Sequence, residues 1–415
     1  MSAFSYRNRI LHAEAVPVTD IARRFGTPCF VYSRAAIEAN YRAYARALAG
    51  RNAVICYSVK ANSNLAVLAL LARLGAGFDI VSGGELARVR AAGGDARKIV
   101  FSGVGKSESE IEQALRARIL CLNLESEEEL ERVAAIAARL KMRAPVAFRV
   151  NPDIDAKTHP YISTGLRSTK FGVPYSRAAR LYRRASRLPG IEVIGLGFHI
   201  GSQMRGPAPL AAAVRRIAAL ARTLETSGIA LRHIDIGGGI GIRYRTERVA
   251  PIGRFVARCL AALGDRSEGL IFDPGRSIVG NAGILLTRVE YVKASSAKKF
   301  LVVDAAMNDL VRPALYGAWH DVIPARKKAG KSRVYDVVGP VCESADFLAQ
   351  RRALVASAGD VLAILSAGAY GMVLSSNYNS RPRAAEILVD RGRAHLVRAR
   401  ERVAQLFAGE SLVAA

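Results

Sequence analysis

The sequence predicts an α/β protein in which a (β/α)8 barrel is joined to a second, mainly antiparallel β domain. The barrel is predicted because apolar strand-like runs alternate with amphipathic helical patterns eight times between residues 36 and 280. The second domain is predicted because short β-rich runs follow one another after residue 281 with few helical periods between them. A doubly wound open sheet is the competing layout for the first part, but its first strand-to-helix turn lacks a GxGxxG fingerprint.

The expected elements follow in chain order. A helix is expected at Val18 to Phe25 and, after Gly26-Thr27-Pro28, a strand at Cys29 to Tyr32. The barrel strands are expected at Ala53–Tyr57, Phe78–Val81, Ile99–Phe101, Ile119–Leu124, Val146–Val150, Val193–Ile200, His233–Ile236 and Leu270–Phe272. Amphipathic helices separate them, as at Ser126 to Lys141 and Leu210 to Ser227. The later strands are expected at Leu285–Val292, Phe300–Val303, Val334–Val338, Asp360–Leu365 and Ala385–Val389, before a last amphipathic segment at Arg398 to Phe407.

Length and composition indicate a globular protein of two domains that does not span a membrane. The 415 residues exceed one ordinary domain, and 51% hydrophobic with 23% charged residues is typical of a soluble protein. The most apolar late stretch, Ala353 to Leu374, is interrupted by Asp360 and is rich in Ala, Gly and Ser. No apolar core with a cleavage site follows Arg7 and Arg9, so no signal peptide is expected.

Cysteine and histidine usage favours a cytoplasmic protein without a metal site. The five cysteines form no paired spacing, which indicates a reducing compartment. They are Cys29, Cys56, Cys121, Cys259 and Cys342. The six histidines show no HExxH pattern and no Cys/His ligand spacing, so no metal is expected.

The net charge of +26 raises the question of a nucleic-acid partner. The arginines are spread over several separate segments, without aromatic residues interleaved at a regular spacing. The one dense basic run, Arg326-Lys327-Lys328 with Lys331, is expected on an exposed loop. We therefore interpret the charge as a solvated surface and expect no specific nucleic-acid recognition.

The stretch Tyr57-Ser58-Val59-Lys60-Ala61-Asn62 places a lysine where a strand ends and a helix begins. A desolvated ammonium at the exposed end of a strand can lose its proton and act as an amine nucleophile. Most lysines are solvated surface groups, so this assignment depends on what else lies at the same rim.

In barrels of this kind the chemistry gathers at the carboxyl ends of the strands. The sequence places there Lys60, Asp79, Ser82 to Glu85, Arg149, His199, Gly237 to Gly239, and Asp273 to Arg276. In the run Gly237-Gly238-Gly239, backbone N–H groups can approach a phosphate closely. An isolated glycine triplet is more often a tight turn, but the two loops after the seventh and eighth strands together favour a phosphate site.

A lysine beside a phosphate site is what a lysine-bound pyridoxal phosphate (PLP) requires. His199 can stack on the aromatic ring of PLP, and Ser202 can donate a hydrogen bond to the phosphate. Asp273 can pair with the pyridinium nitrogen, so that the ring stays protonated and accepts electrons. The alternative for His199 is a structural histidine at a strand end. The alternative for Asp273-Pro274-Gly275 is a segment that only forms a turn.

The second domain supplies candidate substrate-binding and acid groups. Arg312 and Tyr316 lie four residues apart, and Arg276 and Arg312 are both suited to bidentate binding of a carboxylate. In Gly339-Pro340-Val341-Cys342-Glu343-Ser344 a thiol lies beside a carboxylate. A buried cysteine is usually inert, but on such a loop the thiol can act as an acid.

These motifs resemble those of the diaminopimelate decarboxylases, PLP enzymes of the alanine-racemase-like (fold type III) group that also contains the ornithine and arginine decarboxylases. The resemblance runs nearly end to end, from Gly26-Thr27-Pro28 to Asn379-Ser380-Arg381-Pro382. The runs YSVKAN (57–62), HIGSQ (199–203) and GGG (237–239) are shared across the wider group and indicate the cofactor. MNDLVRPALY (307–316), GPVCES (339–344) and NYNSRP (377–382) are more specific to this family and indicate the substrate.

The resemblance implies a role for each matching residue. PLP is expected to be bound covalently by Lys60, to be stacked by His199, and to be contacted by Asp79, Ser202, Gly237, Gly238, Gly239, Asp273, Gly275, Arg276 and Tyr370. The substrate is expected to be bound by Arg276, Arg312, Tyr316, Glu343 and Tyr370. Cys342 is implied as the proton donor, reaching the active site from the partner subunit of a homodimer. Residues 1–35 and 281–415 are implied to form the β domain together.

Two positions depart from the family pattern. Asp273 stands where the family usually has glutamate, so its shorter side chain must reach the pyridine nitrogen. Ala345 stands where the family usually has glycine, which matters only if this residue has a positive φ.

The reaction we expect is PLP-dependent decarboxylation of meso-2,6-diaminopimelate to L-lysine and CO2, the last step of lysine biosynthesis. The alternative within enzymes is a decarboxylase of ornithine, arginine or carboxynorspermidine, whose substrates lack a second α-carboxylate. A non-catalytic decarboxylase-like regulator is disfavoured because Lys60 and Cys342 are both present. An RNA-binding protein is suggested by the charge alone.

Overall fold

The structure is a computed structural model that describes residues 3–155, 170–296 and 298–413. The chain forms two units. The barrel unit comprises Asn40–Ile242 and Arg248–Ser277, and the β unit comprises Met1–Ala39, Arg243–Glu247 and Ile278–Ala415.

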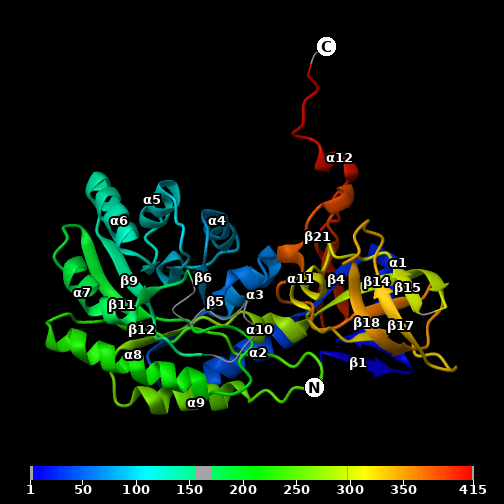
Figure 1. Cartoon of the computed structure of the whole chain (residues 1–415), viewed down its shortest axis with the longest axis horizontal. Coiled ribbons are helices and arrows are strands. Elements are labelled where there is room, and N and C mark those ends of the chain that lie inside the picture. The colour runs from blue at the N-terminus through cyan, green and yellow to red at the C-terminus, as the bar shows by residue number, and fades with distance from the viewer. Residues whose placement is uncertain (1–2, 156–169, 297, 414–415) are drawn as a thin grey trace. The chain divides into compact units, whose positions relative to one another are not determined.

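Eight parallel strands close into a barrel, which confirms the predicted fold class (Figure 1). In ring order the strands are β5 (Ala53–Ser58), β6 (Gly77–Ile80), β7 (Ile99–Phe101), β8 (Cys121–Leu124), β9 (Ala144–Asn151), β11 (Ile191–Gly197), β12 (His233–Asp235) and β13 (Gly269–Phe272). The ring closes because β13 pairs with β5 while β9 pairs with both β8 and β11. The short strand β10 (Val173–Pro174) pairs with β9 outside the ring.

Helices lie on the outside of these strands (Figure 1). They are α3 (Leu65–Arg73), α4 (Gly83–Ala91), α5 (Glu108–Arg116), α6 (Glu127–Leu140), α7 (Tyr175–Ala185), α8 (Ala208–Thr226) and α9 (Ile252–Leu263), with the 3-10 turns η1 (Val59–Ala61) and η2 (Ala96–Lys98). The helices α2 (Arg34–Ala47) and α10 (Arg276–Val279) lie where the chain passes from one unit to the other.

The barrel strands are continuous apolar runs because they are buried on both faces. Inside the ring, Cys56, Val100, Cys121, Ala147, Ile194 and Ile271 pack into one cluster. Complete burial of a Val or Ile side chain contributes roughly 1.5–3 kcal/mol, so this cluster holds the strands in register. Ser82 and Ser126 then start α4 and α6 by accepting hydrogen bonds from the N–H groups of Glu85 and Glu129.

The β unit is mainly antiparallel, as predicted. Its larger sheet runs in the order β18-β17-β15-β14-β4-β20-β21, with β19 on β14 and β16 on β19. The strands are β4 (Cys29–Ser33), β14 (Gly283–Ala294), β15 (Lys299–Val303), β16 (Val322–Pro324), β17 (Arg333–Val338), β18 (Phe347–Leu354), β19 (Val361–Ile364), β20 (Ala385–Asp390) and β21 (Arg393–Arg398). A small sheet joins β1 (Phe4–Arg7), β2 (Ile10–Ala13) and β3 (Val16–Pro17), and the helices are α1 (Val18–Phe25), α11 (Arg312–Tyr316) and α12 (Val403–Leu406).

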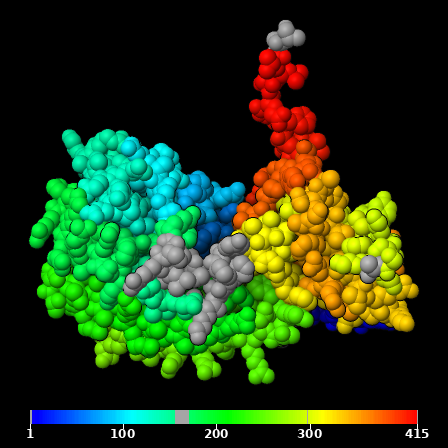
Figure 2. Space-filling view, viewed as in Figure 1, coloured from blue at the N-terminus to red at the C-terminus, as the bar shows by residue number. Residues whose placement is uncertain are grey.

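The C-terminal segment differs from the expectation. Strand β21 ends at Arg398, and only Val403–Leu406 of the expected amphipathic segment is helical. No residue of this four-residue helix is buried, so tertiary packing does not extend it. The chain beyond it, red in Figure 2, extends away from the rest of the β unit, and Leu412 and Val413 are 101% and 96% exposed.

Candidate functional site

Lys60 lies in η1, immediately after strand β5, at the carboxyl end of the barrel. Its Nζ lies 2.7 Å from Oδ2 of Asp79, a side chain without solvent exposure at the end of β6. The hydroxyl of Ser58 donates to the same Oδ2 at 3.3 Å and contacts the backbone oxygen of Asp273 at 2.8 Å. The ends of β5, β6 and β13 are therefore joined around the lysine.

The glycine loop after β12 packs so tightly that no other residue fits. A Cβ at Gly238 would lie 2.4 Å from the backbone oxygen of Asp273, and one at Gly239 would lie 2.1 Å from that of Gly201. Gly239 also has a φ of 82°, in the left-handed region that favours glycine. The backbone of Met204 donates to the Gly239 oxygen at 2.9 Å, which joins this loop to the loop carrying Ser202. The result is a cradle of backbone groups suited to a phosphate.

Gly275 and Arg276 lie at the same end of the barrel. A Cβ at Gly275 would lie 2.9 Å from Cβ of Ala61, next to the lysine. The buried Arg276 donates from Nε to Oγ of Ser202 at 3.2 Å. The structure thus brings Lys60, Asp79, Ser202, the glycine loop and the Asp273–Arg276 loop together.

Asp273 presents a buried acceptor that nothing satisfies among the described residues. Its Oδ1 has no hydrogen-bond partner, and Nδ1 of His199 lies 3.9 Å away. Burial raises the pKa of Asp273 well above its usual range, and the carboxyl groups of Asp235 and Asp79 raise it further. A cationic N–H donor would both satisfy Oδ1 and stabilise the carboxylate. The pyridinium N–H of PLP is such a donor, so the residues present fit this cofactor.

His199 is held as a neutral imidazole. Burial lowers the pKa of His199 well below its usual range, and the positive charges of Arg149 and Lys60 lower it further. An uncharged ring beside the glycine loop is suited to lie against a pyridine ring. A Cβ at Gly237 would lie 3.4 Å from its Nδ1.

Two other residues that were expected at the carboxyl rim, Glu85 in α4 and Arg149 in β9, make structural contacts. Glu85 accepts a hydrogen bond from the N–H of Val81 at 2.7 Å, and burial raises the pKa of Glu85 to about 7. Arg149 pairs with Glu125 at 3.4 Å, and its guanidinium lies 4.7 Å from the centre of the Phe171 ring.

Asp235 is a site residue that the sequence analysis does not identify. Its Oδ1 accepts from the N–H of Gly237 at 2.9 Å, and its Oδ2 lies 3.4 Å from Nδ2 of Asn123. Burial, with a contribution from the charge of Asp79, raises the pKa of Asp235 to about 7. The sequence does contain a signal for the orientation of Asp235. Polar residues alternate in His233-Ile234-Asp235, and alternate residues of a strand face the same side of the sheet. Asp235 thus fixes the start of the glycine loop from inside the barrel.

The raised pKa of Asp235 predicts a stability that depends on pH. A proton binds this carboxylate more tightly in the folded than in the unfolded chain, so the stabilisation is complete below the ordinary value of 3.8 and is lost as pH rises through about 7. Asparagine does not titrate. For the apoprotein, the quantity to follow is the free energy of unfolding of Asp235→Asn minus that of wild type. We expect this difference to increase by more than about 1 kcal/mol between about pH 5 and about pH 8, because only the wild type loses stabilisation over this range. Urea unfolding measures this difference.

The matched control is Asp265→Asn, which changes an exposed aspartate of the same unit. Its stability difference from wild type should stay constant over the same pH range. A pH-independent difference for Asp235→Asn would contradict the assigned pKa.

In the β unit, Arg312 begins α11 and is buried. Its Nη1 lies 2.9 Å from Nε2 of His320, and the guanidinium lies 4.9 Å from the centre of the Tyr244 ring. Tyr316 ends the same helix. A guanidinium presents a planar fork of N–H donors that is suited to bidentate binding of a carboxylate.

The three motifs specific to the resemblance form one cluster. Asp346 accepts hydrogen bonds from the N–H groups of Met307 at 2.6 Å and Val341 at 2.7 Å, which joins residues 307–316 to residues 339–344. Oδ1 of Asn379 accepts from the N–H of Cys342 at 2.8 Å, which adds residues 377–382. Cys342 and Glu343 are exposed at this cluster.

Two details of the β unit bear on the remaining candidate residues. Tyr370 is half-buried and has a φ of 55°, which fixes an unusual backbone conformation at this position. Ala345 is not among the non-glycine residues with positive φ. The alanine that replaces the usual glycine there is therefore not strained.

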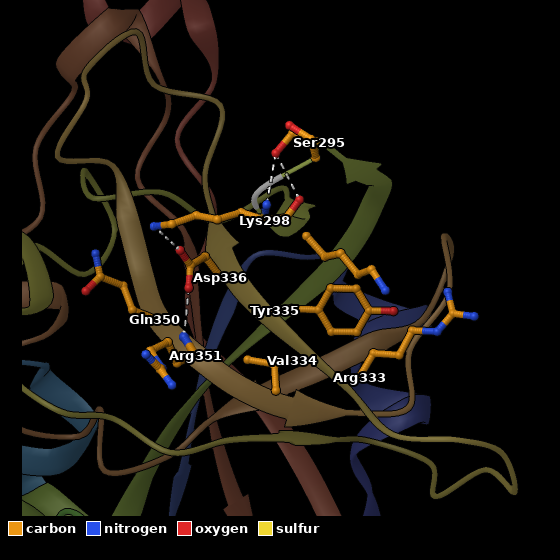
Figure 3. Close-up of a pocket in the computed structure, with 10 residues that line it drawn as sticks. Ser295, Lys298, Arg333, Val334, Tyr335, Asp336, Gln350 and Arg351 are labelled. Carbon is orange, nitrogen blue, oxygen red and sulfur yellow. Dashed lines mark hydrogen bonds and ion pairs between the residues drawn. The ribbon is translucent and has the colours of Figure 1, made fainter.

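A pocket of about 550 Å³ lies in the β unit beside β15, β17 and β18 (Figure 3). Asp336 lies within it, accepting hydrogen bonds from Nζ of Lys298 at 3.0 Å and from the N–H of Arg351 at 2.7 Å. These bonds stabilise the register shift between β17 and β18. Both carboxylate oxygens are engaged in this structural role, so the pocket offers no available acid group.

The described residues lack both a metal-binding cluster and a membrane-spanning helix. They contain no group of three or more His, Cys, Asp or Glu side chains arranged to hold a metal ion. Within the same ranges, no helix has the length and apolar character needed to cross a membrane.

Comparison with known proteins identifies relatives over the whole chain. Residues 34–280 match the family described as pyridoxal-dependent decarboxylase, pyridoxal binding domain. The diaminopimelate decarboxylase of Pseudomonas aeruginosa is 56% identical over 413 residues, covering 100% of both chains. That of Vibrio cholerae is 52% identical over 415 residues, also covering 100% of both.

Solved structures give the same result. The diaminopimelate decarboxylase of Helicobacter pylori, crystallised with L-lysine, superposes with a TM-score of 0.91 at 42% identity, covering 94% of this chain and 98% of that one. The enzyme of M. jannaschii superposes with a TM-score of 0.95 at 34% identity, covering 99% of this chain and 98% of that one.

Proposed function

The chain belongs to the diaminopimelate decarboxylase family, and we propose that it converts meso-2,6-diaminopimelate to L-lysine and CO2 with PLP as cofactor, the last step of lysine biosynthesis. The observation that best supports PLP chemistry is the unsatisfied Oδ1 of Asp273 at the rim that carries Lys60 and the glycine loop. A lysine, a phosphate cradle and a buried acceptor are the groups that this cofactor requires.

In this proposal residues 36–280 bind PLP. Lys60 binds it covalently, His199 lies against the ring, and Asp273 accepts a hydrogen bond from the pyridinium nitrogen. The phosphate is bound by Ser202, Gly237, Gly238, Gly239, the backbone at Gly275 and Arg276, and Tyr370. Asp79, 2.7 Å from the lysine Nζ, holds the ammonium in place before the cofactor binds. When bound, PLP accepts the electron pair that the substrate carbon retains as CO2 leaves.

The substrate carries two α-amino-acid ends, and only the D-configured end loses CO2. The distal L end needs a partner for its carboxylate and one for its ammonium. Arg312 and Arg276 are suited to bind the carboxylate, and Glu343 is suited to bind the ammonium. Tyr316 and Tyr370 line the same substrate site in this proposal. Ornithine has no distal carboxylate, so an arginine dedicated to that group would distinguish the two substrates.

Replacing Arg312 with alanine tests the substrate assignment. We expect kcat/KM for meso-diaminopimelate to fall about 100-fold, because a bidentate charge-assisted pair contributes roughly 2–3 kcal/mol. The fall should appear mainly in KM, and the absorbance of the lysine-linked cofactor should be unchanged. Steady-state assays of CO2 release measure both constants.

Arg393→Ala, which changes an exposed arginine of β21, is the matched control and should behave as wild type. Arg312→Lys keeps the charge but loses the planar fork of the guanidinium. Its kcat/KM should therefore lie between that of Arg312→Ala and that of Arg393→Ala. If Arg312→Ala turns over meso-diaminopimelate as wild type does, the substrate assignment is wrong.

The product also needs a proton on the carbon that lost CO2. We assign this proton to the thiol of Cys342, because delivery from one face fixes the configuration of the product. Following the resemblance, the thiol comes from the partner subunit of a cytoplasmic homodimer, with residues 1–35 and 281–415 supplying substrate and dimer contacts. The exposure of Cys342 in the single chain is compatible with this role.

Mixing two inactive variants tests the shared site. Lys60→Ala and Cys342→Ala homodimers should each be inactive. After subunit exchange, half of the dimers are mixed and one of their two sites is intact, so about a quarter of wild-type activity should return. A mixed dimer isolated with two affinity tags that shows no activity would contradict a thiol donated across the interface.

A further inference from the structure

A second pocket, of about 370 Å³, opens at the opposite end of the barrel from Lys60. It is lined by residues at or just before the amino ends of β7, β8, β9, β11 and β12. The buried side chains of Leu115, Ile119 and Ile194 contribute its apolar surface. Its volume lies within the range of small-molecule sites, about 300–1,000 Å³.

His233 lines this pocket with a buried nitrogen that has no partner. The residue is 7% exposed, and its Nε2 makes no hydrogen bond among the described residues. The imidazole packs where strand β11 has a glycine, since a Cβ at Gly195 would lie 2.2 Å from Nε2. Burial, with a contribution from Arg232, lowers the pKa of His233 to about 4. A neutral imidazole left unpaired in this way costs about 1–3 kcal/mol, so the ring at this end of β12 is held in place at the expense of stability.

Four arginines also line the pocket: Arg97, Arg118, Arg143 and Arg232. Two have acidic partners, because Arg97 pairs with Asp95 and Arg232 pairs with Glu192. The exposed Arg118 and Arg143 make no ion pair within the described ranges. Guanidinium groups bind carboxylates and phosphates through two parallel hydrogen bonds.

We propose that this pocket binds a small organic anion, a carboxylate or phosphate group on a short apolar body, as an effector. The arginines at the rim bind the charged group, and the apolar surface contacts the body of the ligand beside the His233 ring. No lysine, thiol or titrating acid of the decarboxylation site lies here, so the ligand is bound without being converted.

Strand β12 links this pocket to the glycine loop. It has three residues, with His233 at its start and Asp235 at its end. Two residues of strand span only about 7 Å. Asp235 in turn accepts the hydrogen bond from Gly237 that fixes the loop. A ligand that restrains His233 therefore changes the affinity for PLP, and linkage requires that PLP change the affinity for the ligand by the same factor.

The test uses PLP-loaded enzyme, with hexanoate and inorganic phosphate as the probes. Binding is measured by calorimetry and by the NMR signal of the His233 ring, assigned with His233→Gln. We expect hexanoate to bind and to shift this signal. The double variant Arg118→Ala/Arg143→Ala should bind at least about tenfold more weakly, through loss of the charge-assisted pairs. If inorganic phosphate also binds, and the same double variant weakens its binding, the phosphate group alone is sufficient for recognition by the arginines.

The matched control is Arg254→Ala/Arg258→Ala, which removes two exposed arginines of α9 outside the pocket. It should bind as wild type does. The proposal is overturned if neither probe binds, if the double variant retains full affinity, or if the His233 signal does not move. Because the assay does not measure turnover, these outcomes are independent of the decarboxylase assignment.

Discussion

Replacing Lys60 with alanine is expected to lower the rate of CO2 release by at least about four orders of magnitude. The lysine amine is the covalent attachment point in our proposal, and alanine offers neither this bond nor an ammonium for Asp79. The contact at 2.7 Å between Nζ and Asp79 would be lost, leaving a carboxylate without solvent exposure that has lost this cationic partner and keeps the hydrogen bond from Ser58. The absorbance of the lysine-linked cofactor should disappear together with the activity.

Lys98→Ala is the matched control. Lys98 belongs to η2, and its Nζ donates to the backbone oxygen of Gly75 at 3.3 Å. This variant should keep the cofactor absorbance and the activity of wild type. A Lys60→Ala enzyme that still binds PLP covalently would place the attachment on another residue.

Replacing Asp273 with asparagine is expected to give the next largest loss, a fall in kcat of about 100- to 1,000-fold. The amide is nearly isosteric, so the fold and the phosphate contacts should remain. Without the negative charge, however, the pyridine nitrogen is not held protonated, and the cofactor accepts electrons poorly. Steady-state kinetics with PLP at saturation measure the effect on kcat.

Asp273→Glu separates charge from reach, because it restores the residue usual in the family. Asp273 is 9% exposed, and its backbone oxygen would lie only 2.4 Å from a Cβ at Gly238. The added methylene must be accommodated in this packed environment, but the charge is retained, so the loss should be much smaller than for asparagine. If asparagine and glutamate lower kcat equally, charge at this position is not what matters.

Much of the fold is predictable because burial and sequence pattern agree. The barrel strands are apolar runs buried on both faces, and each expected run overlaps an observed strand within a few residues. Several strands of the β unit are not among the expected ones: β1, β2, β3, β16, β18 and β21. β18 contains Gln350-Arg351-Arg352 with a left-handed Arg351, and β21 is an edge strand with mostly exposed or half-exposed residues, so neither has a clear apolar pattern.

The candidate site is predictable where a residue lies at a strand end. Lys60, Asp79, His199 and Asp273 are expected at the carboxyl rim and lie there. Asp235 is the last residue of β12 but lies inside the expected strand His233–Ile236, and its importance follows from a hydrogen bond with the N–H of Gly237 that local sequence does not specify. The interaction of Asp346 with two distant motifs is likewise a tertiary contact, since its partners are Met307 and Val341.

The most direct test of the account is release of CO2 from meso-diaminopimelate by the purified protein, with and without added PLP. We expect CO2 and L-lysine in equal amounts, dependence on PLP, and no comparable turnover of ornithine or arginine. Turnover of ornithine or arginine in preference to meso-diaminopimelate, or L-lysine formation that does not depend on the cofactor, would contradict it.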